Sequence, residues 1–379
     1  MIYDFIVIGA GIAGASAAYE LAPHGSVLLI EAEAQPGYHS TGRSAALFTR
    51  NYGTPLVRKV NALSEPFFLT PPEGFTDRAL LSPRGALSVA GPGKEALLNP
   101  VLAASTSRDP LHEMPVAEAL ERAPILRPER VARVVYEPGV TDIEVSVLLA
   151  GFLKGYKQRG GILQVRAPVR ALAYKSGIWH VTAGADTYTG KTIVNAAGAW
   201  ADQIGALAGA APIGLVAKRR TAILLDGPQG MDVARMPCVD FAETDAYIKP
   251  DAGKLMVSPG DATPTEPQDA QPDELDVAIL ADWVMRETRI EVRRIAHSWA
   301  GLRSFIADGS PVVARDAVVP DFIWLAGQGG YGIMMAPALA RVAAALGTSG
   351  PMPADFLEVG LSLADLTAGR ASAQGPRFH

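Results

Sequence analysis

Apolar side chains gather in short blocks at the start of the chain. Ile2 to Ile8 is nearly continuous in apolar residues, which is typical of a strand buried on both faces of a parallel sheet. Small and apolar residues fill Ile12 to Leu21, as suits a helix packed tightly on that sheet, and Ser26 to Ile30 follows as a second apolar block. The pattern predicts a strand, a helix and a second strand.

Glycines separate the first predicted strand from the helix with the spacing G-x-G-x-x-G. Gly9 allows a tight turn, Gly11 lets the backbone approach a pyrophosphate, and Gly14 brings helix and strand together. The helix N-terminus offers free N–H groups and a positive dipole to phosphates. The second strand ends at Glu31, about 20 residues on, where an acidic side chain meets an adenosine ribose. This context predicts a dinucleotide site; the alternative is a glycine-rich packing turn.

Two later segments also pair a strand with small residues. A meander is predicted with strands around Val169–Tyr174, Ile178–Thr182 and Thr192–Val194, the last of which runs into small residues that either admit a ligand or serve packing. Near the C-terminus, Phe322–Ala326 precedes four glycines and a helical stretch, Ile333–Leu346. Such a turn offers a second site for an anion or a carbonyl. We expect one sheet built from both chain ends.

The segments between these blocks have a different texture. Proline, charge and short alternating runs such as Ala217–Leu225 and Ala246–Val257 are typical of an antiparallel sheet. We assign these segments to a substrate domain. Thr263–Asp276 is an acidic polar loop whose charges we expect to be solvated surface, and it leads to a helix around Glu274–Glu287.

Composition narrows the class of protein. The 379 residues are 49% hydrophobic, which excludes a disordered or fibrous chain, and one core stops growing at about 250–300 residues, so two domains are expected. A net charge of −5 lacks the basic stripe that nucleic acid requires. The six histidines show no metal-ligand spacing, so no metal is expected.

The cellular location of the protein is inferred from its cysteine count and from its apolar segments. The lone Cys238 excludes an internal disulfide and indicates a reducing, cytoplasmic location, peripheral to the inner membrane if a quinone accepts the electrons. The apolar N-terminus contains Asp4 and no basic leader, so we expect it to belong to the fold and not to be a signal peptide. Glycines interrupt the uncharged run Phe322–Ala340, which argues against a membrane span.

Three features favour FAD over NAD: the meander, the C-terminal glycine turn, and the absence of a separate nicotinamide-type catalytic domain. Four blocks, 37–46 (GYHSTGRSAA), 194–200 (VNAAGAW), 299–311 (WAGLRSFIADGSP) and 327–332 (GQGGYG), then resemble the FAD-dependent D-amino acid oxidase (DAO) superfamily, most closely its bacterial D-arginine dehydrogenases. The resemblance covers nearly the whole chain.

The resemblance implies an α/β fold (α+β overall): a glutathione-reductase-type, Rossmann-like FAD domain (1–50, 137–211 and 298–379) interleaved with an antiparallel substrate domain (51–136 and 212–297). It implies hydride transfer from the α-carbon of an amino acid to flavin N5, giving an imino acid that hydrolyses to a 2-oxo acid and ammonia. FAD is expected to be non-covalent, because Cys238 is far from the C-terminal glycine turn.

The residues that the glycine motif and the resemblance together assign to the cofactor are Gly9, Gly11, Ile12, Ala13, Gly14, Glu31, Ala32, Ser40, Arg43, Ser44, Ala45, Ala46, Val169, Ala196, Gly198, Trp200, Gly301, Arg303, Gly329, Gly330, Tyr331, Gly332 and Ile333.

A substrate carboxylate calls for a planar, bidentate cation. Arg220 and Arg303 match the carboxylate-binding positions of the family, although arginines in such places also serve surfaces and domain interfaces. Tyr52 and Tyr247 match its active-site tyrosines, with aromatic packing as the alternative. The Gly330 carbonyl matches an acceptor for the substrate amine.

Two departures from the resemblance bear on the substrate. Ala86 stands where the relative has a carboxylate for the distal guanidinium of arginine, and Leu47 stands for a pocket histidine. An apolar wall leaves a buried guanidinium unpaired, at a cost of several kcal/mol. We predict poor activity on D-arginine and a D-amino acid substrate with a neutral or apolar side chain, unless another acidic residue on a loop substitutes.

Other functions stay open at this point. Glycine, sarcosine or a cyclic secondary amine of the proline type is the first alternative substrate. A 2-hydroxy acid dehydrogenase and a flavin-binding subunit without turnover are weaker alternatives. The sequence does not decide whether oxygen or a quinone accepts the electrons, nor the oligomeric state.

Overall fold

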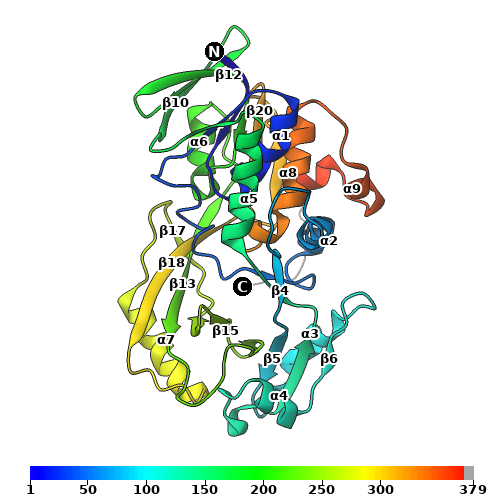
Figure 1. Cartoon of the computed structure of the whole chain (residues 1–379), viewed down its shortest axis with the longest axis vertical. Coiled ribbons are helices and arrows are strands. Elements are labelled where there is room, and N and C mark those ends of the chain that lie inside the picture. Colours follow the sequence, from blue (N-terminus) through cyan, green and yellow to red (C-terminus); the bar gives the residue numbers. More distant parts are fainter. Residues whose placement is uncertain (371–379) are drawn as a thin grey trace.

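The computed structural model describes residues 1–370, and its first feature is a sheet with five parallel strands at one end of the molecule (Figure 1). The parallel strands, in spatial order, are β9 (Ile162–Gln164), β2 (Val27–Ile30), β1 (Ile2–Ile8), β12 (Asp186–Asn195) and β20 (Phe322–Ala326). Antiparallel strands β10 (Val169–Lys175), β11 (Ile178–Ala183) and β19 (Val312–Arg315) complete this eight-stranded sheet. Strands from both chain ends belong to this one sheet, as the sequence predicted, with β1 and β20 on either side of β12.

Helices cover one face of this sheet. Those that pack together there are α1 (Ile12–Leu21), α5 (Val145–Gln158) and α8 (Gly332–Gly347), with α2 (Pro55–Leu69) against α8 (Figure 1). The other face packs against the β10–β11 meander and α6 (Ala201–Leu207). A Cβ on Gly14 would lie 1.8 Å from the Gly9 carbonyl oxygen, so only glycine permits this approach of α1 to β1.

A second, nine-stranded sheet fills the opposite end of the molecule (Figure 1). Its spatial order is β17 (Thr263–Thr265), β13 (Val216–Leu225), β16 (Lys254–Ser258), β15 (Tyr247–Asp251), β14 (Cys238–Phe241), β5 (Ala86–Ala90), β7 (Arg133–Glu137) and β6 (His112–Glu113), and β18 (Ile295–Phe305) also pairs with β13. Only the β14–β5 pair is parallel. A three-stranded sheet of β3 (Leu47–Phe48), β8 (Thr141–Ile143) and β4 (Leu81–Pro83) lies apart from both.

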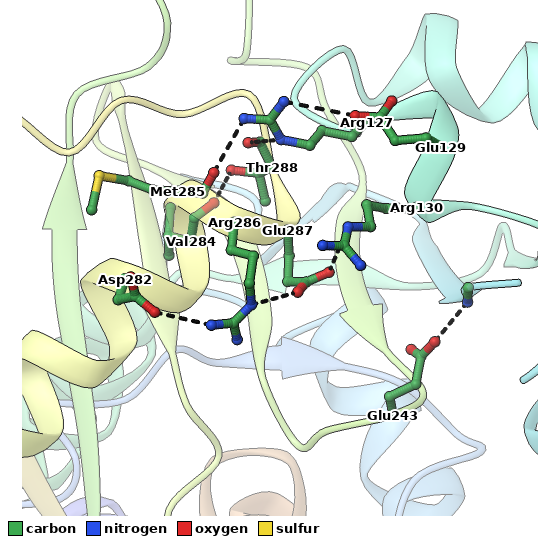
Figure 2. Close-up of polar contacts among 11 residues, drawn as sticks. Arg127, Glu129, Arg130, Glu243, Asp282, Val284, Met285, Arg286, Glu287 and Thr288 are labelled. Carbon is green, nitrogen blue, oxygen red and sulfur yellow. Dashed lines mark hydrogen bonds and ion pairs between the residues drawn. The ribbon is translucent and has the colours of Figure 1, made fainter.

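One face of the nine-stranded sheet is covered by α4 (Val116–Arg122) and α7 (Glu274–Glu287), whose apolar residues share a core with the strands. Figure 2 shows the polar contacts at the C-terminal end of α7: Arg127 donates to the Thr288 carbonyl at 2.7 Å, and Arg130 lies 3.6 Å from Glu287. Exposed ion pairs of this kind contribute about 0–1 kcal/mol each. Apolar packing therefore holds α7, and these contacts fix its orientation.

The mixed α/β class predicted from the sequence is confirmed. The division into two interleaved domains stays a prediction, and β18 runs unbroken across the expected boundary at 298. The interpretation of 263–276 as solvated surface is wrong in part: β17 pairs with β13, Ala270 is buried, and Asp269 is bound by Arg43. Within residues 1–370, no helix combines the length and apolar character of a membrane span.

Candidate active site

A cavity of about 710 Å³ lies between the two large sheets. At one end it is lined by Gly9 and Glu31 from the eight-stranded sheet, and at the other by Arg220, Tyr247 and Arg303 from the nine-stranded sheet. A ligand that fills it therefore contacts the predicted dinucleotide motif and the predicted substrate residues together.

The glycine turn shapes the first end of the cavity. Gly9 has φ +98°, and a Cβ there would lie 2.5 Å from the Ala196 carbonyl oxygen. Gly11 precedes α1 and gives it no side-chain cap; the Thr41 hydroxyl accepts from the Ile12 N–H, and the N–H groups that follow Ile12 in the first turn suit phosphate oxygens. Glu31 accepts from the backbone N–H groups of Ala10 at 2.8 Å and Glu33 at 2.9 Å. These bonds fix the carboxylate at the cavity wall, in the place that suits a ribose hydroxyl.

The structure brings most of the predicted cofactor residues to the cavity wall. Three are not in its lining: Gly14, Ala46 and Tyr331. Gly14 lies within α1 and packs on the Gly9 carbonyl, Ala46 has the strained φ of +27°, and Tyr331 contacts Tyr52 with ring centroids 5.0 Å apart. The predicted cofactor residues that do line it are Gly9, Gly11, Ile12, Ala13, Glu31, Ala32, Ser40, Arg43, Ser44, Ala45, Val169, Ala196, Gly198, Trp200, Gly301, Arg303, Gly329, Gly330, Gly332 and Ile333.

Among the lining residues that the sequence analysis missed are Thr41, Trp299 and Gln328. Each stands inside a block that carries the family resemblance, so those blocks could have supplied them. Thr41 accepts from the Ile12 backbone N–H at 3.0 Å, and Trp299 donates to the Arg43 carbonyl at 3.2 Å. Both contacts hold the first turn of α1 and the 40–45 segment in place.

The Arg43 guanidinium is occupied by protein groups. It donates to the carbonyls of Ala300 at 2.8 Å and Ala270 at 3.0 Å, and it pairs with Asp269, which also accepts from the Tyr38 hydroxyl at 3.2 Å. Arg43 thus ties the loop after β17 to the cavity wall, and this contact lowers the pKa of Asp269.

Arg220 and Arg303 lie on the same face of neighbouring strands. In the β13–β18 register Arg220 pairs with Gly301 and Lys218 with Arg303, so the two arginines are diagonal neighbours. Gly301 has no side chain opposite Arg220, and a Cβ there would lie 3.4 Å from the Arg43 Cβ. Within residues 1–370, neither arginine forms an ion pair; the Arg220 Nε is buried without a partner, and Arg303 has the Tyr52 hydroxyl as a hydrogen-bonding neighbour.

The electrostatics of this arginine pair favour the binding of an anion. Burial, together with the charge of Arg303, lowers the pKa of Arg220. Burial also opposes the charge of Arg303, but the neighbouring Tyr52 and Tyr247 raise its pKa above the ordinary value. Two cations held together in a water-poor cavity are costly without a counter-charge. A carboxylate bound by both guanidinium groups supplies one.

The remaining predicted substrate residues are not all at the cavity. Gly330 and Tyr247 line it, whereas Tyr52, Leu47 and Ala86 are not in its lining. Tyr52 is 47% exposed beside Tyr331, whose pKa is raised to about 12 by burial and by Tyr52. Leu47 lies in β3 and Ala86 begins β5. Within residues 1–370 no cluster of metal-binding side chains is found, and Cys238 is buried in β14, outside the lining.

Comparison with known proteins decides the family. A family profile described as FAD dependent oxidoreductase (DAO) matches residues 4–346. The chain belongs to the DAO family. FAD is therefore its cofactor, and the choice of FAD over NAD is confirmed.

Relatives within the DAO family agree with this. A glycine oxidase from Geobacillus kaustophilus is 23% identical over 88% of this chain and 90% of that protein. The crystal structure of glycine oxidase from that organism has a TM-score of 0.81 at 21% identity, covering 97% and 99% of the two chains. L-proline dehydrogenase from P. horikoshii has a TM-score of 0.80 at 21% identity, covering 95% and 99%. Each of these proteins is similar to the chain over most of its length, and the finer resemblance to D-arginine dehydrogenases stays a prediction.

Proposed function

We propose that this protein oxidises the C–N bond at the α-carbon of an amino acid, with bound FAD as the hydride acceptor. The observation that carries the proposal is the pair of guanidinium groups of Arg220 and Arg303, which line the cavity and form no ion pair within residues 1–370. A planar carboxylate accepts bidentate hydrogen bonds from such groups. It thereby neutralises the pair and fixes one end of the substrate.

The chain's own residues orient and shield the reacting carbon. With the carboxylate on the arginines, the α-carbon is held near the Gly330 end of the cavity, where the Gly330 carbonyl accepts from the amine and aligns it. FAD supplies the redox chemistry; the protein supplies position and exclusion of water. Tyr247 closes the side of the cavity next to the arginines.

For the substrate, the relatives support a small amino acid: glycine, an N-methylated glycine such as sarcosine, or a cyclic secondary amine of the proline type. A D-amino acid with a neutral side chain is the second candidate. It is favoured by the apolar Met256 and Ala222, which line the cavity beside Arg220. The expectation that D-arginine is a poor substrate follows from the apolar Ala86 and Leu47, and it applies unless another acidic residue binds the guanidinium.

Anaerobic mixing of the FAD-loaded protein with each amino acid tests the proposal. Glycine, sarcosine, both enantiomers of proline, D-leucine, D-methionine and D-arginine form the panel, and loss of the oxidised flavin spectrum is the signal. A 2-hydroxy acid such as lactate is the control for carboxylate binding without an amine. If no amino acid bleaches the flavin, the proposal is wrong; if only lactate does, the protein oxidises hydroxy acids.

A further inference from the structure

One carboxylate beside the substrate end of the cavity has no role so far. Asp240 lies on β14 and pairs with Tyr247 on β15, which lines the cavity. Paired residues of neighbouring strands project from the same face of a sheet. Asp240 therefore lies on the cavity-facing side of the nine-stranded sheet, one strand beyond Tyr247.

Hydrogen bonding fixes one oxygen of Asp240 and leaves the other available. The Ser88 hydroxyl donates to Oδ1 at 3.0 Å, from the strand that runs parallel to β14. Burial raises the pKa of Asp240 to about 6, with the neighbouring Glu137 adding to the rise. Among residues 1–370 no lysine or arginine forms an ion pair with Asp240. A desolvated carboxyl in this position gains most from a donor brought by a ligand.

Other charged side chains on this face already have partners. Lys249 donates to the Ala45 carbonyl and to Asp142, each at 2.8 Å. Glu137 accepts from the Thr49 hydroxyl at 2.7 Å and from the Asn51 amide at 2.9 Å. Asp240 is thus left as the acidic group that a bound molecule can engage.

The distance between Arg220 and Asp240 suits an amino acid whose carboxylate is bound by the arginines and whose side chain extends toward Asp240. β13, β16, β15 and β14 are consecutive in the sheet, and the register places Asp240 in line with Ala222, two residues from Arg220. The Cα atoms of Arg220 and Asp240 are therefore about 16 Å apart at the usual strand and residue spacings. The long Arg220 side chain covers part of this gap. An amino acid side chain of ordinary length spans the remainder when its carboxylate lies on the guanidinium groups.

We propose that Asp240 determines specificity by binding a hydrogen-bond donor, an ammonium or amide group, at the distal end of the substrate side chain. The inference rests on the proposed amino acid oxidation but goes beyond it. Glycine and proline carry no distal group, so their turnover is independent of Asp240. Side chains that end in a donor gain from Asp240, and side chains that end in a carboxylate are rejected.

Matched substrate pairs test this. D-lysine against D-norleucine and D-glutamine against D-glutamate differ mainly in the distal group, and the L-enantiomers are assayed in parallel. In the wild-type protein we expect the donor-bearing member of each pair to have a kcat/KM about tenfold higher or more, as a hydrogen bond to a charged group provides. In Asp240→Asn the ratio for lysine over norleucine falls to about twofold, and glycine turnover and FAD content are unchanged.

A matched control and a second variant distinguish a specific effect of Asp240 from a general effect of removing a buried carboxyl. Glu137→Gln removes the charge of the other buried carboxyl and is expected to leave the lysine-to-norleucine ratio unchanged. Asp240→Val provides a variant without any polar group if the asparagine still binds the donor. The proposal for Asp240 is overturned if both Asp240 variants keep the wild-type ratios, or if Glu137→Gln abolishes them. Failure of glycine and every other amino acid to reduce the flavin instead overturns the proposed function.

Discussion

The guanidinium of Arg303 packs directly on the backbone of Gly330. A Cβ at Gly330 would lie 3.0 Å from Nη1 and 3.1 Å from Cζ of Arg303. Gly329 supports this contact, because its N–H donates to the Ser304 carbonyl at 2.8 Å and joins the glycine turn to β18. The position of one proposed carboxylate-binding arginine is therefore set by the turn that also lines the FAD cavity.

Gly330→Ala is expected to displace Arg303 and to raise the KM for amino acids about tenfold or more, since a shift of the bidentate donor costs one charge-assisted hydrogen bond. Steady-state kinetics measure the KM, and flavin absorbance measures FAD content. Gly139→Ala is the control, because a Cβ there meets nothing within 4 Å. An unchanged KM in Gly330→Ala would contradict the proposed role of the contact.

Removing either arginine tests the carboxylate site itself. Arg220→Ala and Arg303→Ala are each expected to weaken amino acid binding by about 2–3 kcal/mol, with FAD content near normal. Arg219 provides a matched control: it neighbours Arg220 on β13 but pairs with Asp276, at 2.6 Å. Arg219→Ala should leave the KM unchanged. If Arg220→Ala or Arg303→Ala lost only the cofactor, its assignment to the substrate would be wrong.

Local sequence patterns correctly predicted the helices and strands whose formation depends mainly on residues close together in the chain. The ends of α1 and α7 match the predicted Ile12–Leu21 and Glu274–Glu287, and the strand–turn–helix interpretation of 322–346 holds. These follow from glycine turns and apolar periodicity, which act over a few residues.

Contacts between distant segments could not be predicted in the same way. Asp240 is beside Ser88 only because β5 and β14 pair in parallel, and parallel pairing has no local signature in the sequence. The sequence analysis therefore allowed for another acidic residue in place of the carboxylate missing at Ala86, but it could not say which residue this is. Likewise, Asp269 is bound to Arg43 across 226 residues, so its loop was taken for solvated surface.

The Asp269 contact predicts a role in FAD retention. Asp269→Ala removes the acceptor for Arg43 and Tyr38 and loosens the loop over the cavity wall. Because the Asp269 side chain is 44% exposed, we expect a modest effect, a two- to fivefold faster release of FAD, in line with about 1 kcal/mol for such a pair. The rise in free-flavin fluorescence after dilution of the FAD-loaded protein measures the rate. Glu266→Ala, an exposed acid on the same loop, is the control and should release FAD at the wild-type rate.

The raised pKa of Asp240 predicts how stability depends on pH. Its value of about 6 lies above the ordinary 3.8, so the folded protein holds this proton more tightly than the unfolded chain. The resulting stabilisation is present below pH 4 and is lost as the pH rises through about 6.

Relative to Asp240→Asn, which does not titrate, the wild-type free energy of unfolding should fall by about 1–2 kcal/mol between pH 4 and 7, discounted for partial exposure. Urea unfolding of the FAD-loaded proteins across this range measures the difference. Comparing the two proteins at each pH removes the part of the Glu137 contribution that does not depend on Asp240, since the raised pKa of Glu137 acts in the same direction in both. A difference that stays constant or grows in favour of the wild type with rising pH would show that Asp240 is ionised and well solvated, and a solvated carboxylate gains little from a substrate donor.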